Sequence, residues 1–165
     1  MSPVPDRAET LVLGIGNELF TDEGLGVVAA RRIADLALPG VEVLDGATLG
    51  LALLPEIADR TSVLLLDAVV AGELAPGTVL TLAADQIPMA RSIMMSAHQI
   101  GVVDALAAAE LAGCAPRRLA AVGMVPISLE MGYGLSPDAE RGLDEVVDQA
   151  LCQLAAWDIP VPTRA

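Results

Sequence analysis

The sequence predicts an α/β protein: a three-layer α/β/α fold around a twisted, mostly parallel, five-stranded sheet with one antiparallel edge strand. Short apolar runs typical of buried strands alternate along the chain with longer segments of helical periodicity. Most neighbouring runs are far enough apart for a helical crossover, which parallel strands require. At 165 residues the chain has the length of one domain, so we expect a single unit over 1–165 with flexible ends at 1–8 and 158–165.

The strands are predicted from apolar runs that end at glycine, aspartate or proline. Residues 10–16 and 62–70 are nearly continuous apolar runs, typical of strands buried on both faces. Residues 77–83 follow the second of these after only a brief turn, which favours an antiparallel edge strand over a parallel crossover. The complete set of expected strands is 10–16, 41–46, 62–70, 77–83 and 118–126.

The helices are predicted between these strands. Residues 24–38 carry apolar side chains at helical spacing and stop before Pro39 and Gly40. A shorter helix or turn-helix is expected over 50–60, with Pro55 near a bend or a first turn. The other expected helices are 98–113, which ends at Gly113, and 136–157, an amphipathic closing helix.

Composition and charge exclude several classes of function. The formal net charge is −13, and the nine basic residues are all arginine. This charge disfavours nucleic acid and anionic membranes as partners and favours a cation or a basic protein. Without lysine the chain can form neither a Schiff base nor a P-loop. No apolar run reaches transmembrane length and the start does not resemble a signal peptide, so we expect a cytoplasmic protein. We also expect a monomer.

The two cysteines suggest no special chemistry. Cys114 and Cys152 lie far apart and outside any C-x-x-C pattern, which argues against a disulfide framework or a thiolate metal site. We expect buried or idle thiols in a reducing compartment. Nucleophilic catalysis is also disfavoured, because the chain has no G-x-S-x-G motif and Cys114 belongs to the sheet edge opposite His98.

Polar residues gather where the predicted parallel strands end. In open α/β sheets ligands bind at this carboxyl edge. Three residues follow the first strand, one follows the second, one ends the third, and the single histidine begins the helix after the fourth. In chain order they are Asn17, Asp22, Glu23, Asp45, Asp67 and His98.

Each of these residues also has a structural explanation. Asp22 and Glu23 could cap a helix N-terminus or complement its dipole, and Asp45 could close an Asx-turn. Asp67 is harder to explain in this way, since a carboxylate at the end of a buried strand needs a partner. Ser96 and Gln99 form a capping box that places His98 in the first helical turn, where the dipole favours the neutral, metal-binding imidazole.

Glu23, Asp67 and His98 together offer two oxygen ligands and one nitrogen ligand from three separate elements. Three protein ligands with open positions are typical of a reactive or exchangeable metal site. The pattern therefore predicts that this edge binds a metal ion.

Two other functions compete with this interpretation. Gly14 and Gly16 begin a dinucleotide-binding G-x-G-x-x-G pattern, but Leu19 occupies the third position and Asp22 and Glu23 would repel a pyrophosphate. A non-catalytic docking or metal-carrier protein is also possible. Adaptable methionines at 89, 94 and 95, with residues 125–137 as the opposite wall, could line a groove for a peptide.

Five segments, in order, resemble the endopeptidases that mature the large subunit of nickel–iron hydrogenases. The resemblance covers essentially the whole chain, and the five segments together are specific although no single one is. They read LGIGNELFTDEGLGV, LDGATLG, LLDAVVAGELAPGTV, SAHQIGVVDAL and VGMVPISLEMGYGLSP.

The resemblance implies functional residues and a reaction. By position, Glu23, Asp67 and His98 match the family's metal-binding and catalytic residues. The family's Asp-Gly-Gly-Thr substrate-recognition segment corresponds to Asp45, Gly46, Ala47 and Thr48, with an extra methyl group at the third position. Asn17 is expected to help bind substrate. Ala97 stands where relatives often have proline, which leaves the capping box intact.

Such enzymes detect nickel already inserted in the large-subunit precursor and then remove its short C-terminal extension. The resemblance thus implies nickel supplied by the precursor as the metal, and the precursor as the partner. Either a carboxylate activates water or the metal polarises the scissile carbonyl. No residue stands out as a covalent nucleophile.

Overall fold

The structure is a computed structural model that describes residues 7–69, 73–87 and 97–162, with residues 97–100 described by their backbone alone. Its five strands form one sheet in the order β2-β1-β3-β5-β4. The parallel strands are β1 (Thr10–Ile15), β2 (Val41–Ala47), β3 (Ser62–Ala68) and β5 (Arg118–Met124). β4 (Val79–Ala83) is an edge strand that pairs antiparallel with β5, which confirms the predicted sheet.

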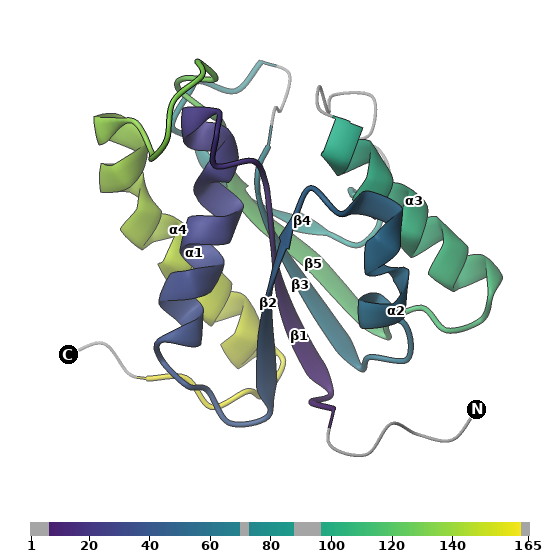
Figure 1. Cartoon of the computed structure of the whole chain (residues 1–165). Helices are drawn as coiled ribbons and strands as arrows, with labels where there is room; N and C mark the ends of the chain where they lie inside the picture. The colour runs from purple at the N-terminus through teal and green to yellow at the C-terminus, as the bar shows by residue number, and fades with distance from the viewer. Residues whose placement is uncertain (1–6, 70–72, 88–96, 163–165) are drawn as a thin grey trace.

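Helices cover both faces of the sheet, so the three-layer fold is confirmed (Figure 1). One face carries α1 (Leu25–Ala34) and α4 (Pro137–Ala156). The other carries α3 (Ala97–Leu111) and the short pair η2 (Gly50–Leu53) and α2 (Leu54–Ile57). A 3-10 turn, η1 (Thr21–Gly24), leads from β1 into α1.

The alternation of side chains along β3 divides the core into two layers. Leu64, Leu66 and Ala68 pack with α1 and α4, whereas Val63 and Leu65 pack with α2 and α3. All seven residues of β3 are buried, as expected for a central strand covered on both faces.

The predicted helix boundaries differ from the structure at two places. Instead of one helix over 24–38, a 3-10 turn precedes α1, and α1 ends at Ala34; Ala37, with φ 48°, is in the left-handed region and cannot continue it. The helix expected over 50–60 is limited to residues 50–57, because the backbone of Ala58 is no longer helical (ψ 138°). Elsewhere the element ends agree within two residues.

The chain ends were expected to be flexible over 1–8 and 158–165, of which 1–6 and 163–165 lie outside the described residues. Ile159 and Val161 pack against the core beside α1 and α4, and the Ile159 N–H donates to the carbonyl of Leu154. The flexibility of both ends stays a prediction.

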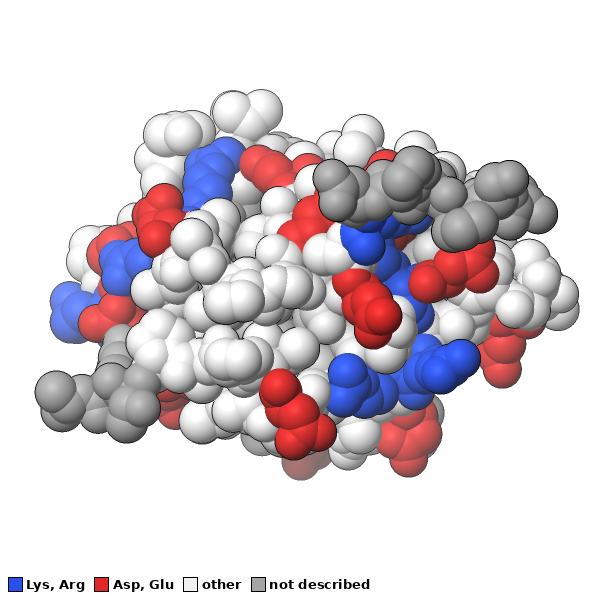
Figure 2. Space-filling model, turned by 90° about the horizontal axis from the view of Figure 1, so that it is seen from below, with Lys and Arg blue, Asp and Glu red and all other residues white. Residues whose placement is uncertain are grey.

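Figure 2 shows the molecule from the amino ends of the parallel strands, where acidic and basic atoms alternate around a broad uncharged area. Arg60, with a side chain only 1% exposed, pairs with Glu42 at 2.6 Å, and Arg7 pairs with Glu56 at 2.9 Å. Both arginine side chains are thus held in ion pairs.

Within the described residues, no helix combines the length and the apolar character needed to cross a membrane.

Candidate functional site

Gly16 fixes the backbone of Glu23 next to the end of β1. Its φ is 141°, a conformation that residues with a side chain rarely adopt, and a Cβ there would lie 1.9 Å from the carbonyl oxygen of Glu23. The N–H of Asn17 donates to that same oxygen at 3.2 Å. The turn after β1 can therefore close over η1 only with glycine at position 16.

A second close approach brings η1 to the central strand. A Cβ on Gly26 would lie 2.1 Å from the carbonyl oxygen of Leu66 and 2.3 Å from that of Ile15. The first turn of α1 consequently rests directly on β1 and β3, and η1 contacts β3. Half-buried Glu23 is thus held close to the strand that carries Asp67.

Asp67 is a buried carboxylate at the carboxyl end of the central strand, with 6% of its surface exposed. By its parity along β3 it belongs to the face on which Val63 and Leu65 pack against α3. It also lines a small cavity of about 20 Å³ with mainly aliphatic residues, room for one water-sized group. A carboxylate in such surroundings favours a positively charged neighbour.

His98 lies in the first turn of α3, which begins at this same carboxyl edge (Figure 1). Its side chain is outside the described part of the structure, as are Ser96, the Gln99 side chain and the three methionines of the predicted groove. Among the side chains that are described, no three of the His, Cys, Asp and Glu type are grouped to hold a metal ion. The ligand set Glu23, Asp67 and His98 therefore stays a prediction, although all three positions belong to one edge.

Asp22 does not cap the helix as one interpretation proposed, because neither η1 nor α1 has a side-chain cap. It is fully buried and binds the loop after β5 instead. Its carboxylate accepts hydrogen bonds from the N–H groups of Ile127 (3.0 Å), Ser128 (2.8 Å) and Ser136 (2.7 Å), and from the Ser136 hydroxyl (2.9 Å). Asp22 thereby joins the turn after β1 to the loop after β5.

Asp45 lies half-exposed at the end of β2, inside a small network. Its Oδ1 accepts from the N–H of Ala47, which closes the expected Asx-turn, and its Oδ2 accepts from Arg31 at 3.0 Å. Arg31 also pairs with both carboxylate oxygens of Glu18, and the hydrogen bond with Glu18 is the main reason that the pKa of Arg31 is raised above its usual value.

The remaining predicted substrate residues flank this network. Thr48 is exposed one residue beyond β2. Asn17 is half-buried, and its Oδ1 accepts from the N–H of Leu19 at 3.1 Å, so it braces the turn. Asn17, Asp45 and Thr48 thus share the carboxyl edge with Glu23 and Asp67, and their role in binding substrate stays a prediction.

The sequence did not reveal the roles of Glu18, Arg31 and the 127–136 loop. Arg31 and Glu18 are 13 residues apart, and Asp22 binds residues more than 100 positions away. The sequence offers one signal for such a long-range connection: acidic residues expected to be buried outnumber the hydrogen-bond donors near them in the chain.

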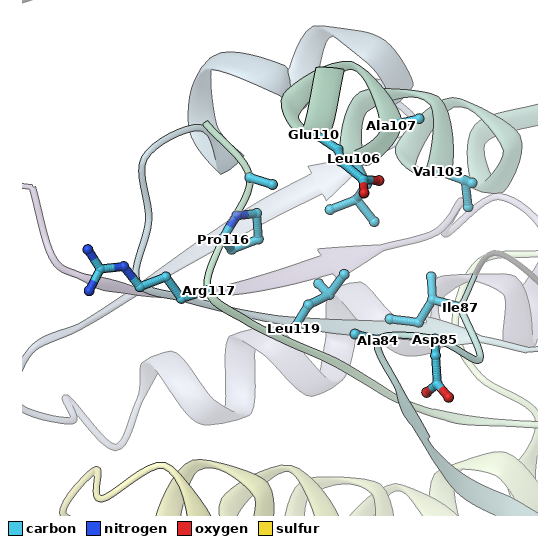
Figure 3. A pocket seen from close by; sticks show the side chains of 11 residues that line it. Ala84, Asp85, Ile87, Val103, Leu106, Ala107, Glu110, Pro116, Arg117 and Leu119 are labelled. Carbon is cyan, nitrogen blue, oxygen red and sulfur yellow. The ribbon is translucent and has the colours of Figure 1, made fainter. Parts of the chain in front are cut away.

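A second, larger cavity lies elsewhere. It has a volume of about 580 Å³, and Leu106 of α3 and Leu119 of β5 face each other across it, while Asp85 and Arg117 point away (Figure 3). It lies between the C-terminal half of α3 and the start of β5, hence toward the amino edge of the sheet.

Both cysteines are free thiols; of the expected buried or idle thiols neither is buried, since Cys114 is partly exposed and Cys152 exposed. Cys114 follows α3, and its backbone carbonyl accepts a hydrogen bond from the N–H of Asp59. It therefore lies at the amino edge, away from the candidate site, as the sequence indicated.

Comparison with known proteins agrees with this geometry. Residues 28–153 match the family model described as hydrogenase maturation protease. The chain is 39% identical to the hydrogenase 2 maturation protease of Escherichia coli (strain K12), over 87% of this chain and 89% of the relative. It is 41% identical to the hydrogenase expression/formation protein HupD of Rhodobacter capsulatus, over 98% of this chain and 77% of the relative.

Solved structures give the same result. The hydrogenase maturating endopeptidase HybD from Escherichia coli superposes with a TM-score of 0.85 at 38% identity, covering 89% of this chain and 92% of that one. The [NiFe] hydrogenase maturation protease HybD from Thermococcus kodakarensis gives a TM-score of 0.71 at 28% identity, covering 87% and 97%. These similarities extend over most of the chain. The chain therefore belongs to the hydrogenase maturation protease family and is a peptidase.

Proposed function

We propose that this protein removes the C-terminal extension of the large-subunit precursor of a [NiFe] hydrogenase after nickel has been inserted. The observation that carries the proposal is the close packing at Gly16 and Gly26, which holds Glu23 of η1 against the strand that ends in buried Asp67. In a member of this family, two carboxylates at one sheet edge suit a substrate that brings its own cation.

The donors at this edge fit nickel as part of the substrate. Nickel(II) accepts carboxylate oxygens and imidazole nitrogens, which are the groups of Glu23, Asp67 and His98. Burial of Asp67 also favours a cation beside it. Coordination by the protease would signal that the precursor is loaded and would hold the scissile bond nearby.

Glu23, Asp67 and His98 are then the catalytic as well as the nickel-binding residues. Either one of the carboxylates would take a proton from the attacking water, or nickel would polarise the scissile carbonyl. Asp45, Thr48 and Asn17 lie at the same edge and would contact the precursor. We further propose that the protein acts as a monomer in the cytoplasm.

Mass spectrometry of the precursor tests this function. The untagged protein is mixed with the nickel-loaded or nickel-free precursor, and the C-terminus of the large subunit is followed. We expect shortening of the nickel-loaded form alone, and loss of shortening by at least 100-fold in Asp67→Asn. Asp85→Asn, at the opposite edge, is the matched control and keeps full activity.

An intact C-terminus in a complex that demonstrably forms would refute the proteolytic function and favour a docking or carrier role. Equal shortening of the nickel-free precursor would refute nickel dependence alone. The two outcomes are separable because binding and cleavage are measured on the same samples.

A further inference from the structure

Large apolar side chains are exposed mainly at the carboxyl edge of the sheet. Ten large hydrophobic residues are exposed in the described part of the chain. Two of them lie at the amino edge: Leu36 follows the end of α1, and Leu111 is the last residue of α3. The other eight lie in the segments that follow β1, β2, β3 and β5, with Leu51 in η2 and the rest in loops: Leu19, Leu49, Leu51, Leu74, Ile127, Leu129, Met131 and Tyr133.

The most exposed of these side chains belong to two loops that are bonded to each other. The N–H of Gly132 donates to the carbonyl of Leu19, and the N–H of Thr21 donates to the carbonyl of Gly132, both at 2.9 Å. The Thr21 hydroxyl donates to the carbonyl of Ser128 at 2.8 Å. The green loop after β5 accordingly lies beside the start of α1 in Figure 1.

Buried Asp22 makes this connection rigid. Its carboxylate accepts from two N–H groups at the start of the loop and from both donors of Ser136 at its end. The backbone of the loop is therefore held while Met131 (83% exposed) and Tyr133 (78% exposed) point outward. A surface ordered before binding loses little conformational entropy when a partner covers it.

We infer that Leu19, Leu129, Met131 and Tyr133 form a preorganised docking surface for the folded body of the large-subunit precursor. This inference rests on the proposed function. The surface is continuous with the candidate site, because Leu19 is four residues from Glu23 and both belong to the turn after β1. A substrate bound at Glu23 would therefore have the docking surface next to it.

Charge and extent identify the kind of partner. The docking surface has exposed Glu130 between Leu129 and Met131, while Arg31 is already paired with Glu18, the chain neighbour of Leu19, and with Asp45. It therefore complements an apolar patch flanked by basic residues. Because the exposed apolar residues extend over loops from four strands, they match a folded protein surface better than the short cleaved tail.

Two polar substitutions without charge change test the docking surface. The double variant Met131→Gln and Tyr133→Gln is compared with wild type and with Leu111→Gln, whose leucine is 90% exposed at the opposite edge. Binding of nickel-loaded precursor is measured by calorimetry, and its shortening by steady-state kinetics. We expect the double variant to raise Kd and KM at least tenfold with kcat unchanged, and Leu111→Gln to match wild type.

A double variant whose Kd and KM stay within twofold of wild type would overturn the docking surface and leave the proposed function intact. A wild-type dimer that becomes monomeric in the double variant would also overturn it, since a second copy of the chain would then cover the surface. A wild type that binds the precursor without shortening it contradicts the proposed function, while the change in Kd still tests docking. Absence of any binding refutes both.

Discussion

Gly16 is the residue on which the position of Glu23 depends most directly. Two separate effects oppose any side chain there: the φ of 141° and the 1.9 Å approach of a Cβ to the Glu23 carbonyl oxygen. The glycine-rich turn is thus used for close packing around an acidic segment. This explains why the resemblance to a phosphate-binding loop ends after its second glycine.

We expect Gly16→Ala to lower the free energy of unfolding by about 3 kcal/mol, because it combines backbone strain with overpacking. Gly40→Ala is the matched control: its φ of 71° is also left-handed, but nothing lies within 4 Å of its Cβ. That variant should lose only about 1 kcal/mol. Urea unfolding measures both, and equal losses would show that the contact with Glu23 has no energetic effect.

Single-residue chemistry also explains why part of the site could be predicted. A charged residue directly after a buried apolar run such as 62–66 needs either a partner or a function. Asp67 was therefore recognisable from its neighbours in the sequence alone. The destination of the Asp22 carboxylate was not, because its donors follow a strand more than 100 residues later. A local pattern predicts a cap there, and the tertiary structure instead supplies better donors.

At the scale of elements, the N-cap residue of α4, Ser136, is also a residue that binds Asp22. The Ser136 hydroxyl accepts from the N–H of Ala139 at the helix N-cap and donates to Asp22. The start of the closing helix and the turn after β1 therefore share one hydrogen-bonded group. Because α4 packs beside α1, the connection also fixes the loop between β5 and α4 at both ends.

A double-mutant cycle measures this connection. Ser136→Ala should lower the free energy of unfolding by about 1–2 kcal/mol through the lost cap, and Asp22→Asn by about 3 kcal/mol through lost charge-assisted bonds. Since the two residues share a bond, the double variant should lose about 1 kcal/mol less than the sum. Asp138→Asn, an exposed acid of the same helical turn, is the control and should change stability by less than about 0.5 kcal/mol. Additive losses would contradict the shared network.

The order and type of the elements were predictable because the period of the apolar residues distinguishes strands from helices, and the length of each connection indicates how neighbouring strands pair. The short link before β4 correctly predicted an antiparallel edge, and continuous apolar runs correctly predicted central strands. Helix ends were less predictable. α1 stops at Ala34, although the apolar spacing continues to Leu38, since Leu38 is buried from the following loop rather than from the helix.

At the scale of the whole molecule, the candidate ligands connect both helical layers to the sheet. Glu23 precedes α1 on one face, Asp67 ends the central strand, and His98 begins α3 on the other face. A metal ion held by all three would cross-link the layers, and its binding energy would add to the stability of the fold. Such a ligand should therefore be detectable in thermal unfolding even without the precursor.

We expect Ni²⁺ to raise the Tm of the untagged protein, by roughly 5–10 °C at a hundred times its Kd, which corresponds to about 2.7 kcal/mol for a domain of this size. Asp67→Asn and His98→Ala should each remove most of this rise. The net charge of −13 means that many other acidic side chains can bind Ni²⁺ weakly. Asp85→Asn therefore serves as the control for nonspecific association of the metal. A rise in Tm that survives both ligand substitutions would assign the metal to the general acidic surface and not to the carboxyl edge of the sheet.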